Sequence, residues 1–137
     1  MGIVRAFLRA NVKTRGIKEI ELSDRFINEE TGKPEIFKIR GLSAKEDGDA
    51  RNESFITSKN GSPTFDNVKY LFKLAAIAVI EPELKNEELQ NDYGVRSPED
   101  LLSVMLLAGE FNDLIQEVMD HSGIKPQLKK VEEAKNS

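Results

Sequence analysis

Hydrophobic and polar positions along the chain change their period several times, which predicts both helices and strands. Over residues 3–12, apolar side chains recur three or four positions apart with arginines between them, the spacing of a short amphipathic helix. Residues 17–22 and 35–42 instead separate β-branched side chains by charges, and the turn-rich residues 28–34 lie between them. We therefore expect an antiparallel β-hairpin with a long loop after the first helix.

The middle of the chain contains two strong helix-start signals. Ser43 and Glu46 form a capping-box pair, which predicts an exposed, polar helix over about residues 44–56. Asp66 is placed to cap a longer helix that is apolar around most of its circumference and that ends at Pro82. Because a helix that is apolar nearly all round is a buried one, we expect this second helix to form the centre of the core. A loop rich in turn residues should join the two.

Three further helices are expected in the second half of the chain, over residues 87–93, 101–107 and 110–121. Asn86 and Ser97 have the side chains preferred at helix N-caps, and a glycine follows the first and the last of these helices. The whole pattern predicts an α+β fold that is mainly helical. Its N-terminal helix and antiparallel β-hairpin should be followed by a bundle of about five helices.

The composition is that of one ordinary globular domain. The chain has 137 residues, of which 32% are charged and 39% are hydrophobic. We expect a single domain over residues 1–124 and a weakly ordered, Lys/Glu-rich tail over residues 125–137. The first residues are too few and too charged for a signal peptide, and no apolar run reaches the length of a membrane helix. A cytoplasmic location and no membrane partner are therefore expected.

Charge is distributed unevenly along the chain. Residues 1–40 contain nine Lys or Arg and six Asp or Glu, a net charge of +3, whereas residues 81–121 contain two and eleven, a net charge of −9. The acidic stretch argues against a nucleic-acid partner, because phosphate groups bind clustered cations. The basic N-terminal side chains leave a regulatory or nucleic-acid-binding module as the alternative function: Arg5, Arg9, Lys13, Arg15 and Lys18.

Residues that could carry chemistry are few. The chain has no cysteine and one histidine, so we expect no metal site and no cofactor. Calcium-loop and phosphate-loop patterns are incomplete. The acid pairs Glu87–Glu88 and Glu99–Asp100 begin expected helices, and His121 ends one, where their charges suit the helix dipole. The chain is therefore predicted not to be an enzyme. The alternative is an enzyme that uses these paired carboxylates for catalysis.

The apolar side chains of the second half are the strongest candidates for partner binding. Residues 101–107 are apolar around more than one helix face, and a small domain cannot easily bury every face. This surplus is either additional core or a groove that receives a segment of another protein. The candidate partner-binding residues are Leu102, Met105, Leu106, Phe111, Leu114 and Ile115.

Several short blocks also occur in a characteristic order from about residue 7 to about residue 124. They are Phe7-Leu8-x-x-Asn11-Val12-Lys13, Ser23-Asp24-Arg25-Phe26, Gly32-Lys33-Pro34, Tyr70-x-x-Lys73-Leu74-Ala75-Ala76, Pro82-x-Leu84-x-Asn86-x-Glu88-Leu89-Gln90, Tyr93-Gly94-Val95, Leu102-x-x-Met105-Leu106 and Gly109-Glu110-Phe111. Together they resemble the XkdN-like phage tail assembly chaperones of phages and defective prophages of Gram-positive bacteria. Residues 44–64 depart most from that pattern.

The resemblance implies a non-catalytic protein of the host cytoplasm that is absent from the mature virion. Such chaperones coat the tape measure protein, keep it soluble and help to recruit tail tube subunits. The implied partners are therefore the tape measure protein, the tail tube protein and a frameshifted, longer form of the chain itself. Codons for Ala134-Lys135-Asn136 can contain the adenine-rich heptamer on which ribosomes slip.

Overall fold

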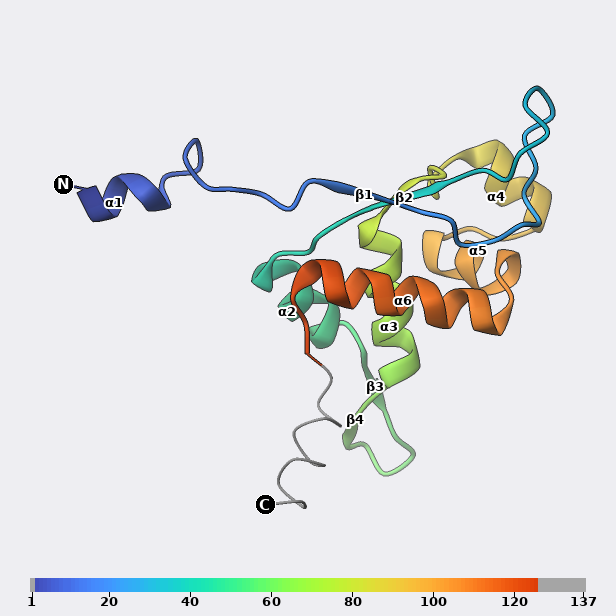
Figure 1. Cartoon of the computed structure of the whole chain (residues 1–137). Coiled ribbons are helices and arrows are strands. Elements are labelled where there is room, and N and C mark those ends of the chain that lie inside the picture. Colours follow the sequence, from blue (N-terminus) through green and yellow to red (C-terminus); the bar gives the residue numbers. More distant parts are fainter. Residues whose placement is uncertain (1, 126–137) are drawn as a thin grey trace, which may run out of the picture.

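The computed structural model describes residues 2–125 as a helical body, a small sheet and an N-terminal arm (Figure 1). The α+β, mainly helical fold class is confirmed, with five helices after the first hairpin in this part of the chain. In chain order the elements are α1 (Gly2–Phe7), β1 (Ile17–Ile20), β2 (Phe37–Arg40), α2 (Ala44–Asn52), β3 (Phe55–Thr57), β4 (Pro63–Phe65), α3 (Asn67–Ala78), β5 (Val79–Glu81), α4 (Glu87–Tyr93), α5 (Pro98–Met105) and α6 (Ala108–Ser122).

The expected hairpin is present, and a third strand extends it into a sheet of order β1-β2-β5. β1 and β2 are antiparallel, with Ile20 opposite Phe37. β5 pairs antiparallel with the other edge of β2, so the prediction that the central helix continues to Pro82 is wrong at its end. The helix stops at Ala78 because the β-branched Val79 and Ile80 gain strand pairing with β2, which overrides a weak helical preference.

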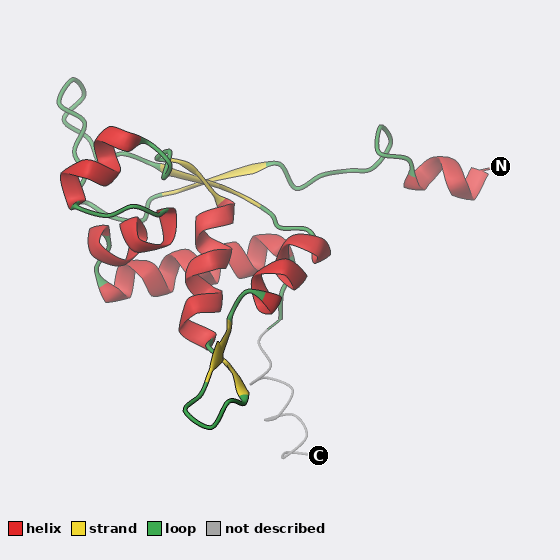
Figure 2. Cartoon of the chain, turned by 180° about the vertical axis from the view of Figure 1, so that it is seen from behind, coloured by secondary structure: helices red, strands yellow, loops and turns green. Residues whose placement is uncertain are grey.

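A second hairpin, β3-β4, lies where the end of a helix and a loop were expected. α2 ends at Asn52 rather than near residue 56, and β3 follows after the buried Ser54. The Ser54 hydroxyl donates to the carbonyl of Ala50 at 2.6 Å, and the Ser54 carbonyl accepts from the amide of Asp66 at 2.7 Å. These contacts join the end of α2 to the start of α3 (Figure 2). The bond between Ser54 and Ala50 is local, but Ser54 and Asp66 are 12 residues apart, so no local pattern indicates the contact between them.

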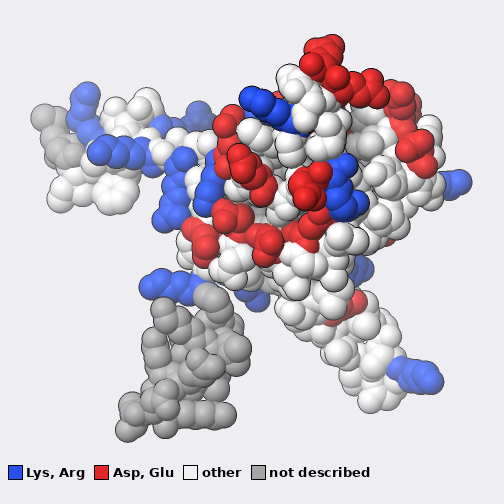
Figure 3. All heavy atoms as spheres, turned by 45° about the vertical axis from the view of Figure 1, so that its right-hand side comes forward, with Lys and Arg blue, Asp and Glu red and all other residues white. Residues whose placement is uncertain are grey.

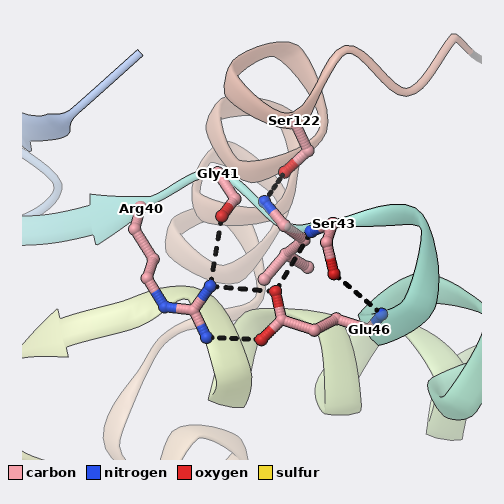
Figure 4. A network of polar contacts seen from close by, with 6 residues as sticks. Arg40, Gly41, Ser43, Glu46 and Ser122 are labelled. Carbon is pink, nitrogen blue, oxygen red and sulfur yellow. Dashed lines mark hydrogen bonds and ion pairs between the residues drawn. The ribbon is translucent and has the colours of Figure 1, made fainter. Parts of the chain in front are cut away.

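The start of α2 is joined to the sheet and to α6 by a polar network (Figure 4). The predicted capping box is confirmed: the Ser43 hydroxyl accepts from the Glu46 amide at 3.1 Å, and the Glu46 carboxylate accepts from the Ser43 amide at 3.0 Å. Arg40 at the end of β2 binds both oxygens of the same carboxylate, at 2.9 and 2.6 Å. The hydrogen bond from Arg40 holds the pKa of Glu46 at about 2.

Helix α3 is the central helix of the core, as expected. It packs against α2, α5 and α6, and α6 also contacts β2. Figures 1 and 2 show α6 crossing α3 beneath the sheet. The largest fully buried apolar side chains come from the sheet and from these helices: Phe37, Ile39, Leu74, Leu101, Leu102, Leu114 and Val118.

The ends of α4 and α6 follow their sequence signals. Gly94 and Gly123 adopt left-handed conformations with φ of 70° and 72°, as helix C-caps. The expected last helix, over residues 110–121, begins earlier than predicted, because α6 starts at Ala108 and contains Gly109 in its first turn. The Glu110 carboxylate accepts from the Leu107 amide at 2.8 Å, which satisfies a free N–H group at the helix start.

The N-terminal segment forms an arm that extends away from the body (Figure 1). Its helix α1 covers only Gly2–Phe7, whereas the pattern predicted residues 3–12. The helix ends early because its apolar face has no surface to pack on, and short isolated helices are only marginally stable in water. The expected weakly ordered tail lies, apart from Lys125, outside the described residues. No helix of residues 2–125 combines the length and the apolar character needed to cross a membrane.

Candidate partner-binding groove

Most of the predicted partner-binding side chains lie in the core. Leu102 and Leu114 are fully buried, and the other aliphatic members and Met105 are at most 9% exposed. The reason is that α5 packs between α3 and α4, so that two of its faces are covered at once. In this conformation these residues stabilise the fold. Met105 and Phe111 differ from the rest because each borders or supports an opening at the surface.

Some apolar side chains of α5 and of the residues that follow it nevertheless remain exposed. Val104 is 52% exposed, and Leu107, two residues after the end of the helix, is 58% exposed. The same helix lines, through Glu99, Asp100 and Ser103, a groove of about 490 Å³ between α3 and α5, which we name the α3–α5 groove. It is lined by Asp66, Val68, Lys69, Phe72, Lys73, Ser97, Glu99, Asp100 and Ser103. Its most exposed apolar side chain, Val68, was expected in the core.

The helix starts that border the groove are held by their caps. The Asp66 carboxylate accepts from the Lys69 amide at 3.0 Å, and the Ser97 hydroxyl accepts from the Asp100 amide at 3.1 Å. Phe72 stacks on Phe111 with ring centroids 4.1 Å apart. A groove built on capped helices and stacked rings is preformed, so binding a partner there costs little reordering of the chain.

A second opening lies at the end of the sheet, and we name it the sheet-end pocket. Its volume is about 360 Å³, and its lining is mainly apolar. The charged residues among those that line it are both acidic. The lining residues are Phe26, Glu35, Ile36, Phe37, Glu81, Pro82, Leu89, Tyr93 and Met105.

An arginine outside the predicted set fixes the junction of α5 and α6 near this pocket. Arg25 donates to the Met105 carbonyl at 3.0 Å and, through Nε, to the Glu110 carboxylate at 3.0 Å. The hydrogen bond from Arg25 is the main reason that the pKa of Glu110 falls to about 2. Arg25 and Glu110 occur in the sequence blocks quoted above, but they are 85 residues apart, so no local spacing pairs them.

The acidic residues considered for catalysis lie at the starts of helices. Glu87–Glu88 and Glu99–Asp100 lie in the first turns of α4 and α5. His121 lies in the last turn of α6 as predicted, and its Nε2 donates to the carbonyl of Gly16 at 2.8 Å. Within residues 2–125, no cluster of three or more His, Cys, Asp or Glu side chains could hold a metal ion.

The fold and these openings define a small α+β protein with a groove and an apolar pocket at its surface. The crystal structure of the protein YqbN has the same fold, with a TM-score of 0.73 at 17% sequence identity over 88% of this chain and 95% of that chain. The family described as "Phage XkdN-like tail assembly chaperone protein" matches residues 4–135. This chain therefore belongs to the XkdN-like phage tail assembly chaperones, as its sequence blocks indicated. No curated protein matches it.

Proposed function

We propose that this tail assembly chaperone binds the tape measure protein of its phage in the host cytoplasm, without catalysis, and keeps it soluble. The observation that supports the proposal is the preformed α3–α5 groove with its exposed apolar neighbours, on a chain of this family. A tape measure protein is long, helical and apolar in places, and exposed apolar stripes aggregate unless they are covered. A groove between two helices suits such a client.

The proposed contact is a client helix lying in the α3–α5 groove. A helix that presents apolar side chains at positions i, i+3 and i+7 would contact Val68 on α3, Val104 on α5 and Leu107 just after α5. The charged lining contains both signs, with Lys69 and Lys73 beside three carboxylates. Polar side chains on the edges of the client helix would therefore find partners of either charge.

Binding of the client at the α3–α5 groove should be reversible, because the contact surface is small. One groove gives modest affinity, while many copies along one long client give strong overall retention. The growing tail tube can then displace the copies one after another, and we propose that the chaperone recruits tube subunits in this way. The acidic charge of residues 81–121 would attract basic client segments and discourage non-specific contacts between chaperones.

The decisive experiment is co-expression with the tape measure protein of the same phage. We expect the wild-type chain to raise the soluble fraction of the client several-fold, and Val104→Asp or Val68→Asp to abolish the gain. Both side chains are exposed, so these changes should leave the fold intact, which circular dichroism checks. Ile56→Asp, at an exposed position on β3 that does not line the groove, is the matched control and should act like wild type.

Two results would contradict the proposal. A client whose solubility does not change with the wild-type chain would exclude the chaperone role for this pair of proteins. Full activity of Val104→Asp and Val68→Asp would exclude the α3–α5 groove as the binding surface. The longer, frameshifted partner has a separate test: the nucleotide sequence across codons 133–137 must contain a slippery heptamer.

A further inference from the structure

The N-terminal arm has an apolar face that no other part of residues 2–125 covers. Ile3 and Phe7 are each 77% exposed, and Val4, Leu8 and Val12 are also exposed. Single exposed apolar residues need no explanation, but five of them on one short segment form a surface that water disfavours. A helix of six residues also gains most of its stability from packing against another surface. The arm therefore has the properties of a segment that docks.

The base of the arm is attached to the body at one defined place. Arg15 donates to the carbonyl of Asp120 at 2.9 Å, and the carbonyl of Gly16 accepts from His121 at 2.8 Å. Both contacts lie at the C-terminal end of α6. The sheet-end pocket lies near the other end of this helix, where α6 follows Met105, and a helix of 15 residues is about 22 Å long. The arm thus leaves the body on the side opposite α4 and α5 (Figure 1), whose residues Leu89, Tyr93 and Met105 line the pocket.

The arm and the pocket are complementary in charge and in polarity. Residues 1–18 contain five Lys or Arg and no Asp or Glu, a net charge of +5. The sheet-end pocket has an apolar lining, and its charged residues are Glu35 and Glu81. Figure 3 shows the same contrast over a wider area, with Lys and Arg along the arm and many Asp and Glu on the face of the body.

We propose that the arm of one chain docks in the sheet-end pocket of a second copy. Phe7 enters the pocket against Ile36 and Tyr93, and the neighbouring arginines of the arm face the two carboxylates. A pocket of about 360 Å³ has room for one large side chain and part of its helix. Each copy offers one arm and one pocket, so the contact joins copies head to tail. This surface is separate from the α3–α5 groove.

Sedimentation equilibrium of the purified full-length chain, without client, tests the proposal. We expect wild type to associate as its concentration rises, and less so as salt is added. Phe7→Asp removes the docking side chain, and Ile36→Lys places a positive charge at the pocket. Each variant alone should associate at least about tenfold more weakly, the effect of losing a central aromatic contact. Ile56→Asp is again the matched control and should associate like wild type.

Mixing the two defective variants is the most decisive part of the experiment. The Phe7→Asp chain keeps an intact pocket and the Ile36→Lys chain keeps an intact arm, so an equimolar mixture should form a pair of one copy each. Folding defects cannot imitate this recovery.

A monomeric wild-type chain at high concentration would overturn the proposal, and so would unchanged association of Phe7→Asp. Binding of DNA or RNA at low salt by a chain that stays monomeric would assign the arm to nucleic acid instead. These readouts contain no client, so they are independent of the co-expression experiment and its outcome.

Discussion

The N-terminal arm and helix α6 have similar amphipathic patterns, but the apolar face of α6 is buried and that of the arm is exposed. In α6 the stripe that contains Leu114, Ile115 and Val118 is buried against α3 and the sheet. In the arm, Ile3, Val4 and Phe7 are exposed. The difference shows that an amphipathic pattern specifies a face that needs cover and leaves open which surface covers it. For α6 the surface is in the same chain, and for the arm we place it in another copy.

Truncation of a buried side chain should separate the two regions most strongly. Leu114→Ala removes fully buried methyl groups from α6 and should lower the free energy of unfolding by about 2–5 kcal/mol. Phe7→Ala, in the arm, should change the stability of a dilute sample by no more than about 0.5 kcal/mol. Urea denaturation followed by circular dichroism measures both. Similar losses for the two variants would mean that the arm packs on its own body.

Loss of the Glu46 carboxylate should have an intermediate effect that depends on pH. Glu46→Gln weakens the contacts to Arg40 and to the Ser43 amide and should cost about 1 kcal/mol at pH 7. The pKa of Glu46 is lowered in the folded state to about 2, so its contribution is complete above the unfolded value of about 4.3 and is lost as the pH falls toward 2. Urea denaturation at pH 7, 4 and 2.5 should show the wild-type advantage shrinking. If the stability difference between wild type and Glu46→Gln did not change with pH, the assignment of a lowered pKa to Glu46 would be contradicted.

Removal of the arm's anchor should have the smallest effect on stability. Arg15→Ala removes a surface hydrogen bond to the end of α6 and should change the free energy of unfolding by about 0.5 kcal/mol or less. Proteolysis between residues 8 and 14 should nevertheless become faster in dilute solution, because the base of the arm is held less firmly. Lys18→Ala, which removes an ion pair with Glu117 on the body, is the matched control and should leave the cleavage rate unchanged. Equal acceleration in both variants would show that Arg15 is not the anchor.

Elements with strong local signals were predictable from the sequence. The caps at Ser43, Asp66, Asn86 and Ser97 and the αL glycines at the ends of α4 and α6 are found where the side-chain types indicated. Capping is decided within four residues, so the sequence contains the whole interaction. The three-residue strands β3, β4 and β5 were missed for the converse reason, because each exists only through pairing with a strand elsewhere in the chain.

The candidate site was predictable only in part. The surplus of apolar side chains around α5 was evident from residues 101–107, and Val104 and Leu107 are indeed exposed. Leu102 and Leu114, which were predicted as partner-binding residues, are fully buried in the folded chain, because periodicity identifies an apolar face but not the neighbour that covers it. Phe72, which lines the groove, was assigned by its pattern to the core helix alone.

By itself the sequence determined the local order of this protein: helix starts and ends, the first hairpin, the absence of cysteine chemistry, the charge asymmetry and the family. These properties depend on side-chain type and short spacing. The tertiary structure alone decided which apolar faces are buried and which stay exposed. Burial is a property of pairs of elements, and α5 between α3 and α4 loses both faces that a lone helix would expose. Only the packed chain forms the α3–α5 groove and the sheet-end pocket and leaves the arm exposed.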